Sequence, residues 1–194
     1  MRIRKTSRWS LTAAAICAMG LLWPAPGAAQ TVTGHARAVQ ATTASSGSVT
    51  LADTGTLGGP TDARESSQDT GSIPAVLNGE ALHAATIGWD DQVSSEASVT
   101  DFSVTVGGNT ITAELALARV IAARGSARTR TSIVQGLTIN GAAVAVTDRA
   151  NQSITIPGGT LVINEQAGNV VNALHIVING EADVVIASAS ASAQ

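Results

Sequence analysis

Apolar and polar residues alternate over much of the C-terminal part of the chain. Residues 95–106 read SEASVTDFSVTV, and a two-residue period places Phe102 and Val104 on one side and Ala97 and Val99 on the other. Such alternation is typical of strands that bury one face. We expect the side that carries Phe102 to be the core face of a strand.

The segment 110–123, TITAELALARVIAA, fits two kinds of structure. Its alternation sets Ile111, Ala113, Leu115 and Leu117 on one side of a strand. Ala, Leu, Glu and Arg are also good helix formers, so a helix stays open as the alternative. We favour a strand because the neighbouring segments have β patterns.

Glycine-containing turns separate the alternating runs. They are Gly107-Gly108, Asn140-Gly141, Pro157-Gly158-Gly159 and Asn179-Gly180. Asn-Gly favours two-residue hairpin turns, because both positions need a positive φ. The pattern predicts an all-β fold, an antiparallel β-sandwich or barrel-like sheet built from hairpins. A β-solenoid is the alternative, although the sequence has no fixed repeat length.

The N-terminus has the three parts of a secretory signal peptide. A basic start precedes an apolar stretch over 11–23 and the small residues of PAPGAAQ. We expect residues 1–29 to be removed by cleavage after Ala29. A lipoprotein signal that uses Cys17 is the alternative, but Ile16 stands where a small residue is expected.

Two further parts follow the signal peptide. Residues 30–75 are rich in Ser, Thr and Gly, and we expect a weakly ordered lead-in with short edge strands. Residues 76–194 form the predicted all-β domain.

Removal of the signal peptide changes the composition. Four of the 11 Lys and Arg residues and the single Cys leave with it, so seven Arg face 14 Asp and Glu, a net charge of −7. We therefore expect no nucleic-acid partner and no disulfide. No later segment is long and apolar enough for a transmembrane helix. Together these features predict a secreted or cell-surface protein.

Two groups of residues are candidates for ligand binding. Asp90 and Asp91 follow Trp89, the only tryptophan outside the signal peptide, and such a group could bind calcium or a sugar. Arg128 and Arg130 share one face of a strand and could bind an acidic glycan or a lipid headgroup. The alternatives are a charged loop in the first case and cross-strand pairing with acidic residues in the second.

Nothing in the sequence has the spacing of a catalytic or metal site. His35, His83 and His175 lie far apart, so we expect no metal and no cofactor. We predict a protein that is not an enzyme. A hydrolase that uses His175 or His83 with a carboxylate such as Glu165 is a weaker hypothesis.

His175 lies in the stretch VVNALHIVING. Alternation puts Leu174, Ile176 and Ile178 on the apolar side and His175 on the other. We therefore interpret His175 as a structural residue of a hairpin.

Several segments of the C-terminal third resemble the choice-of-anchor P family of bacterial secreted proteins. They are INEQ at 163–166, VNALHI at 171–176 and DVVIASA at 183–189. The matching motif residues are Asn164, Glu165, Gln166, Asn172, His175 and Asp183. The resemblance implies an exported surface protein with a shared β domain, and it implies no catalytic role.

The chain ends in ASASASAQ, which has no sorting motif or hydrophobic tail. We therefore expect release, or attachment to a partner in the cell envelope or extracellular matrix. The leading hypothesis is a structural or adhesive, non-catalytic role. A secreted glycan- or calcium-binding module is the alternative.

Overall fold

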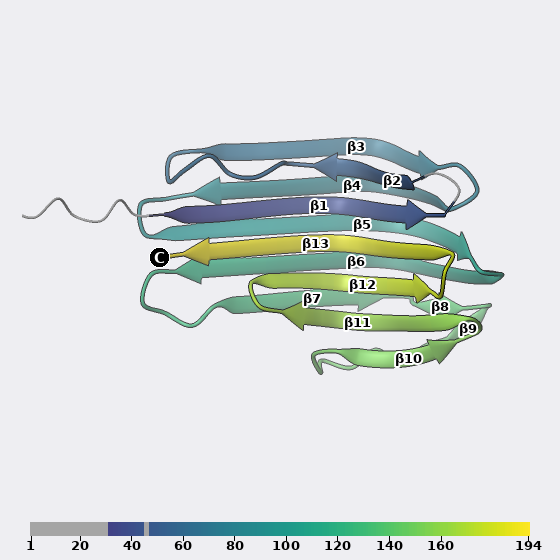
Figure 1. Cartoon of the computed structure of the whole chain (residues 1–194). Coiled ribbons are helices and arrows are strands. Elements are labelled where there is room, and N and C mark those ends of the chain that lie inside the picture. The colour runs from purple at the N-terminus through teal and green to yellow at the C-terminus, as the bar shows by residue number, and fades with distance from the viewer. Residues whose placement is uncertain (1–30, 45–46) are drawn as a thin grey trace, which may run out of the picture.

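The computed structural model describes residues 31–44 and 47–194. These residues form two antiparallel sheets packed face to face, with no helix among them (Figure 1). The all-β prediction is confirmed, and the sheets form a sandwich that is not closed into a barrel. The predicted signal peptide, residues 1–29, lies outside the described residues. No helix in the described part could span a membrane.

In sheet A, the neighbouring strands β1 and β13 both lie in the interior of the sheet. In spatial order its strands are β10 (Gln152–Ile156), β11 (Gly159–Ala167), β12 (Val170–Ile178), β13 (Ala182–Ala193), β1 (Val32–Thr43) and β2 (Gly47–Asp53). The hairpin turns at Pro157-Gly158 and Asn179-Gly180 fall between paired strands, as the sequence predicts.

Sheet B is built around β5 and β6. Its order is β3 (Ala63–Ile73), β4 (Leu77–Gly88), β5 (Gln92–Val106), β6 (Asn109–Ala123), β8 (Thr138–Ile139) and β9 (Ala142–Ala143), and β7 (Thr129–Gln135) also pairs with β6. The segment 110–123 is therefore a strand, and the helix alternative is wrong.

The first described strand differs from the sequence prediction. Residues 30–75 were expected to hold short edge strands, but β1 is 12 residues long and lies inside sheet A between β13 and β2. Its partner β13 comes from the opposite end of the chain, from Ala182 to Ala193. Such a non-local pairing leaves no local sequence signal. Of β1, β2 and β3, only β2 and β3 lie at sheet edges.

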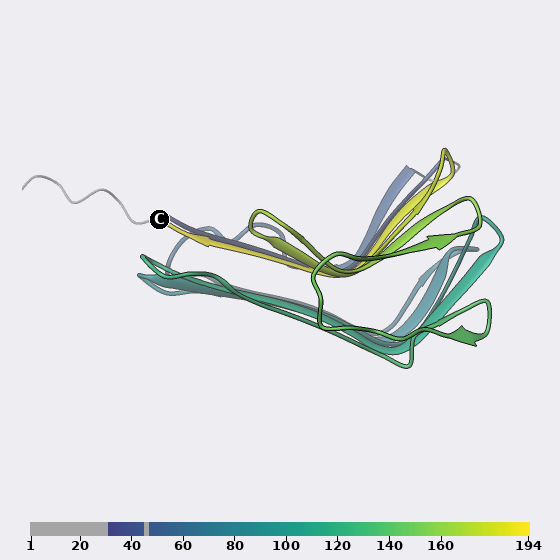
Figure 2. The ribbon, with the colours of Figure 1, turned by 90° about the horizontal axis from the view of Figure 1, so that it is seen from below.

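Both sheets bend in the same sense near mid-length, so the outer face of sheet A is concave and that of sheet B is convex (Figure 2). Left-handed residues mark the bend. In sheet A, φ is 52° at Asn164, 52° at Ala187 and 46° at Ala52, which lie on alternate strands. In sheet B, φ is 43° at both Ala81 and Asp101. A left-handed residue interrupts the extended backbone and bends the strand. Between β4 and β5 the register also shifts near Ala81, as in a β-bulge.

The bend shifts the alternation by one residue. On β5, Val99 and Phe102 are both buried, so Val99 is not on the outer face as the simple alternation predicts. On β6, Ala113 and Ala116 are buried while Leu115 and Leu117 turn outward, again unlike the prediction. At the bend two consecutive side chains turn outward on each strand, Thr100 and Asp101 on β5 and Glu114 and Leu115 on β6, while the β5–β6 register is unbroken. Every side chain beyond the bend therefore changes face.

We name the two halves of the sandwich for their position relative to this bend. The terminal arm contains Thr31 and Gln194, whose backbones are joined by a hydrogen bond of 3.1 Å from the N–H of Gln194 to the carbonyl of Thr31. The distal arm contains the β12–β13 and β5–β6 turns. The core of both arms is formed by Ala, Val, Leu and Ile, with Phe102 as the only buried aromatic residue among those described.

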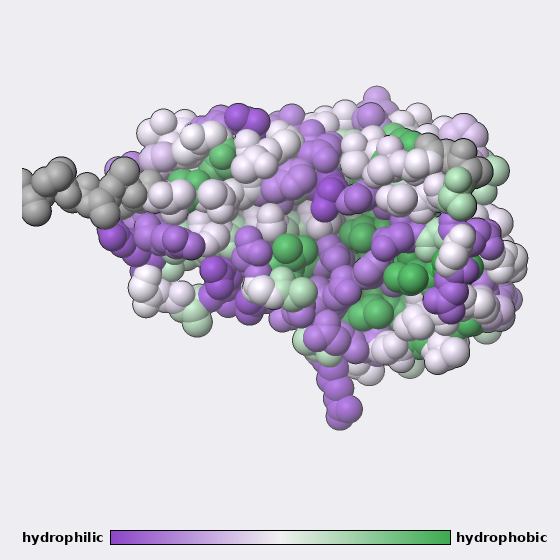
Figure 3. Space-filling model, viewed as in Figure 1, coloured by the Kyte–Doolittle hydropathy of each residue, from purple (hydrophilic) through white to green (hydrophobic). Residues whose placement is uncertain are grey.

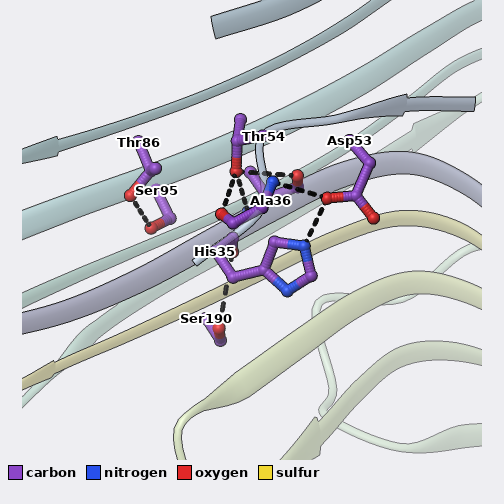
Figure 4. A network of polar contacts seen from close by, with 8 residues as sticks. His35, Ala36, Asp53, Thr54, Thr86, Ser95 and Ser190 are labelled. Atoms are coloured by element: carbon purple, nitrogen blue, oxygen red, sulfur yellow. Dashed lines mark hydrogen bonds and ion pairs between the residues drawn. The ribbon is translucent and has the colours of Figure 1, made fainter. Parts of the chain in front are cut away.

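One polar pair lies inside the core of the terminal arm. The hydroxyls of Thr86 on β4 and Ser95 on β5 are 2.8 Å apart and fully buried (Figure 4). They lie beneath Gly34 of β1, where a Cβ atom would overlap the Thr86 hydroxyl. Glycine at this position therefore allows the two sheets to approach closely over a satisfied hydroxyl pair.

Candidate functional site

The concave outer face of sheet A carries a cluster of four polar side chains. We call Glu165, Asn172, His175 and Asp183 the bend cluster; they come from the adjacent strands β11, β12 and β13. Ala173 and Leu174, between Asn172 and His175, are both buried. This break in the alternation at the bend turns Asn172 and His175 to the same outer face, although strict alternation would put them on opposite faces. Polar and apolar residues are interspersed on this face (Figure 3).

His175 is hydrogen-bonded at both ring nitrogens. Its Nδ1 lies 3.0 Å from each carboxylate oxygen of Glu165, and its Nε2 lies 3.1 Å from Oδ1 of Asp183. Asn172 donates from Nδ2 to Oε2 of Glu165 at 2.6 Å. The His175 side chain is only 21% exposed, so these contacts are partly shielded from water.

The electrostatics of the cluster favour the charged forms. Burial alone lowers the pKa of His175, but hydrogen bonds and attraction from Glu165 and Asp183 outweigh it and raise the pKa above its ordinary value. Burial also opposes the charge of Glu165, yet hydrogen bonds from His175 and Asn172 lower its pKa below the ordinary value. His175 and Glu165 therefore each favour the charged form of the other.

This arrangement limits the chemistry of His175. A general base needs a free ring nitrogen within reach of the proton that it takes, and both nitrogens here face carboxylates. Glu165 and Asp183 lie at opposite edges of the ring, so they do not converge on one ion. Among the described residues, no group of three or more His, Cys, Asp or Glu side chains is arranged to hold a metal ion.

A second pair lies further along the same face. His35 of β1 places Nε2 2.6 Å from Oδ1 of Asp53 on β2 (Figure 4). Burial opposes the charge of Asp53, but its hydrogen bonds from the Gly55 N–H and His35, with attraction from Arg37, lower its pKa. Sequence reasoning missed Arg37 and Asp53, because the pairing of β1 with β2 and β13 was not expected.

Asn164 and Gln166 have a different role from the bend cluster. Asn164 is buried at the bend of β11, and its Oδ1 accepts a hydrogen bond of 2.9 Å from Nε2 of Gln166. The carbonyl of Asn164 accepts the N–H of Asn151, and Oδ1 of Asn151 accepts the N–H of Gln166. These contacts fasten the start of the β10–β11 hairpin. The six predicted motif residues thus divide into two groups with structural contacts.

Trp89, Asp90 and Asp91 form the turn between β4 and β5 at the end of the terminal arm. Trp89 is 45% exposed, and its N–H donates to the carbonyl of Gln92 at 2.7 Å. The carbonyl of Asp91 accepts the N–H of Arg124 from the β6–β7 turn at 2.8 Å. Backbone contacts therefore fix the turn on which the Trp89 ring is presented.

Arg128 and Arg130 connect the two sheets. Arg128 donates from Nε to the carbonyl of Ala191 on β13 at 3.1 Å, and Arg130 donates from Nη2 to the carbonyl of Gly168 in the β11–β12 turn at 2.5 Å. Arg128 also donates from Nη2 to Oγ of Ser192 at 3.4 Å, so the acceptors are backbone carbonyls and a hydroxyl rather than the acidic side chains expected as cross-strand partners. Both arginines turn away from the outer face of sheet B toward sheet A.

No family model, curated protein or solved structure matches the chain. The resemblance to the choice-of-anchor P family therefore remains a prediction. The contacts described above are the basis for a functional proposal.

Proposed function

We propose that the protein is an exported, cell-envelope or secreted β protein with a structural or adhesive, non-catalytic role. The observation that carries this proposal is the bend cluster, in which both ring nitrogens of His175 are held by carboxylates. Polar side chains that bind one another across adjacent strands stabilise a shape and leave no group directed at a substrate.

The cross-sheet contacts support the same role. Arg128 and Arg130 bind carbonyls of sheet A, and charged side chains that bridge two layers keep an extended sandwich from separating at its ends. The pairing of β1 with β13 also favours a stable structure. It joins the first and last strands of the described residues along 11 register pairs.

Export is tested by fractionation of cells that express the full chain. We expect the protein in the envelope fraction or the medium, with Gln30 as its first residue in mass spectrometry. An intact N-terminus found only in the cytoplasm would overturn the export part of the proposal.

The non-catalytic role is tested by screening the purified protein against ester, peptide and glycoside substrates. We expect no turnover above that of a His175→Ala, His83→Ala double variant. Turnover that disappears when His175 is replaced, in a variant that keeps its fold by circular dichroism, would contradict the proposal.

A glycan- or calcium-binding module is the second candidate function. It is favoured by Trp89, which is 45% exposed on a fixed turn beside Asp90 and Asp91. Exposed indole rings provide flat platforms for apolar faces of ligands. A glycan array and a calorimetric calcium titration test it; binding that Trp89→Ala abolishes would support it, and two blank results would exclude it.

A further inference from the structure

The outer face of sheet B carries several large apolar side chains on the terminal arm. Leu115, Leu117 and Ile121 of β6 project outward and are partly exposed. Ile133 of β7, the cross-strand partner of Leu117, is 39% exposed, and Ile87 of β4 is 40% exposed. Large apolar side chains gathered on the outside of a sheet are candidates for an interaction surface. We call these five residues the outer apolar face.

The same sheet is polar beyond the bend. Asp101 and Glu114 are exposed at the bend itself, and the outward positions of the distal arm include Ser103, Thr110 and Thr112. Because the outer face of sheet B is convex, the polar arm also turns away from any partner that lies on the terminal arm (Figure 2). The apolar surface of sheet B thus ends at the bend, which is also where the sheet turns away from a partner lying on the terminal arm.

On the outer face of sheet B in the terminal arm, large side chains of β6 lie beside small side chains of β5, so two copies of the face could fit together. On β5 the outward side chains opposite the large residues of β6 are small: Thr100 pairs with Leu115, Ser98 with Leu117, and Ser94 with Ile121. A two-fold axis along the strands, between β5 and β6, would place β5 of one copy over β6 of the other. Each large side chain would then lie over a small one, as in a well-packed core.

The face is also self-complementary in charge. Glu96 of β5 and Arg119 of β6 form one cross-strand pair in the middle of this face, with Arg119 Nε 3.7 Å from Glu96 Oε2. The same axis would place Glu96 of each copy over Arg119 of the other. In a two-fold interface, residue i contacts j and j contacts i, as these pairs would.

We propose that a second copy of this chain packs on the outer apolar face to form a two-fold dimer. Up to the bend the four strands are about 4.8 Å apart and about 8 residues long, at about 3.3 Å each, so they offer roughly 500 Å² per copy. Stable interfaces bury about 800 Å² per partner and weak ones less than about 600 Å², so the face has the size of a weak dimer.

The test is the molar mass of the purified protein, measured by sedimentation over a 1000-fold range of concentration. We expect a dimer that dissociates on dilution, and Leu117→Glu should weaken it at least tenfold. The matched control Thr112→Glu adds the same charge to β6 on the polar arm and should leave the mass unchanged. A monomer at all concentrations, or a dimer that Leu117→Glu does not weaken, would overturn the proposal.

Exchanging the charges of Glu96 and Arg119 tests how the two copies are oriented in the dimer, even if Leu117→Glu fails to fold. Glu96→Arg alone and Arg119→Glu alone should each weaken the dimer, because like charges would face each other across the axis. The double variant Glu96→Arg, Arg119→Glu should restore it. Equal dimerisation of all three variants would show that these residues do not meet and would overturn the proposed packing.

Discussion

His175 and Glu165 are joined across the bend of sheet A. Glu165 pairs with Asn172 on the terminal arm, whereas His175 pairs with Val162 on the distal arm. The 3.0 Å contacts from Nδ1 of His175 to the Glu165 carboxylate therefore connect side chains from the two arms. Asp183 extends the contact to a third strand through Nε2 of His175. The bend is thus held by ionic side-chain contacts as well as by its backbone.

The free energy of unfolding should depend on pH in two directions. The pKa of His175 is raised from 6.5, so its stabilisation is present below that value and is lost as the pH rises through the folded-state pKa. The pKa of Glu165 is lowered from 4.5, so its stabilisation is present above 4.5 and is lost as the pH falls through the folded-state pKa. We expect maximal stability between these two ordinary values, measured by urea unfolding.

Two histidine variants separate the contribution of His175 to the pH dependence of stability from that of another histidine. His175→Gln should remove most of the decline in stability above the ordinary value of 6.5. His83→Gln should keep it, because His83 is 40% exposed and lies 3.4 Å from a Glu65 that is 65% exposed. Equal slopes in His175→Gln and the wild type would contradict the assignment.

Ala81 tests the role of left-handed residues in the bend. It lies on β4 with φ at 43° and is exposed, so a glycine relieves backbone strain and loses no buried contact. We expect Ala81→Gly to stabilise the protein by about 1 kcal/mol in urea unfolding. Ala85→Gly, on the same strand without a positive φ, should destabilise it by about 0.5–1 kcal/mol. The same loss at both positions would contradict this account of the bend.

The buried hydroxyls of Thr86 and Ser95 should behave as a coupled pair. Thr86→Val leaves the Ser95 hydroxyl buried without its partner, and we expect a loss of about 1–3 kcal/mol. The double variant Thr86→Val, Ser95→Ala should lose less than the sum of the single variants, because no unpaired hydroxyl remains. Calorimetric unfolding of the four proteins measures this, and strictly additive losses would show that the 2.8 Å contact contributes nothing.

Much of the fold is predictable from local patterns. Alternation and turn residues identify the strands from β5 onward, and the turn at Asn140-Gly141 has positive φ values of 52° and 79° as Asn-Gly predicts. The outward position of His175 also follows from alternation. These features depend on residues close together in the sequence, which is why local sequence patterns predict them.

The bend of the sheets and the position of β1 in sheet A cannot be predicted from local sequence patterns. Ala187 and Ala52 adopt a left-handed conformation that alanine rarely prefers, so the residue type gives no sign of the bend. Because the bend was missed, Leu115 and Leu117 were assigned to the wrong face. The interior position of β1 depends on its pairing with β13, about 150 residues away in the chain, and long-range pairing has no local signal.

The central claim is that the bend cluster is a structural clamp, and a double-mutant cycle at Glu165 and His175 tests it most directly. Urea unfolding of the wild type, Glu165→Gln, His175→Gln and the double variant, at one protein concentration, gives the coupling energy. We predict that each single variant loses about 1–3 kcal/mol and that the two residues are coupled by about 1 kcal/mol or more. Losses that are small, or that add within about 0.3 kcal/mol, would contradict the claim.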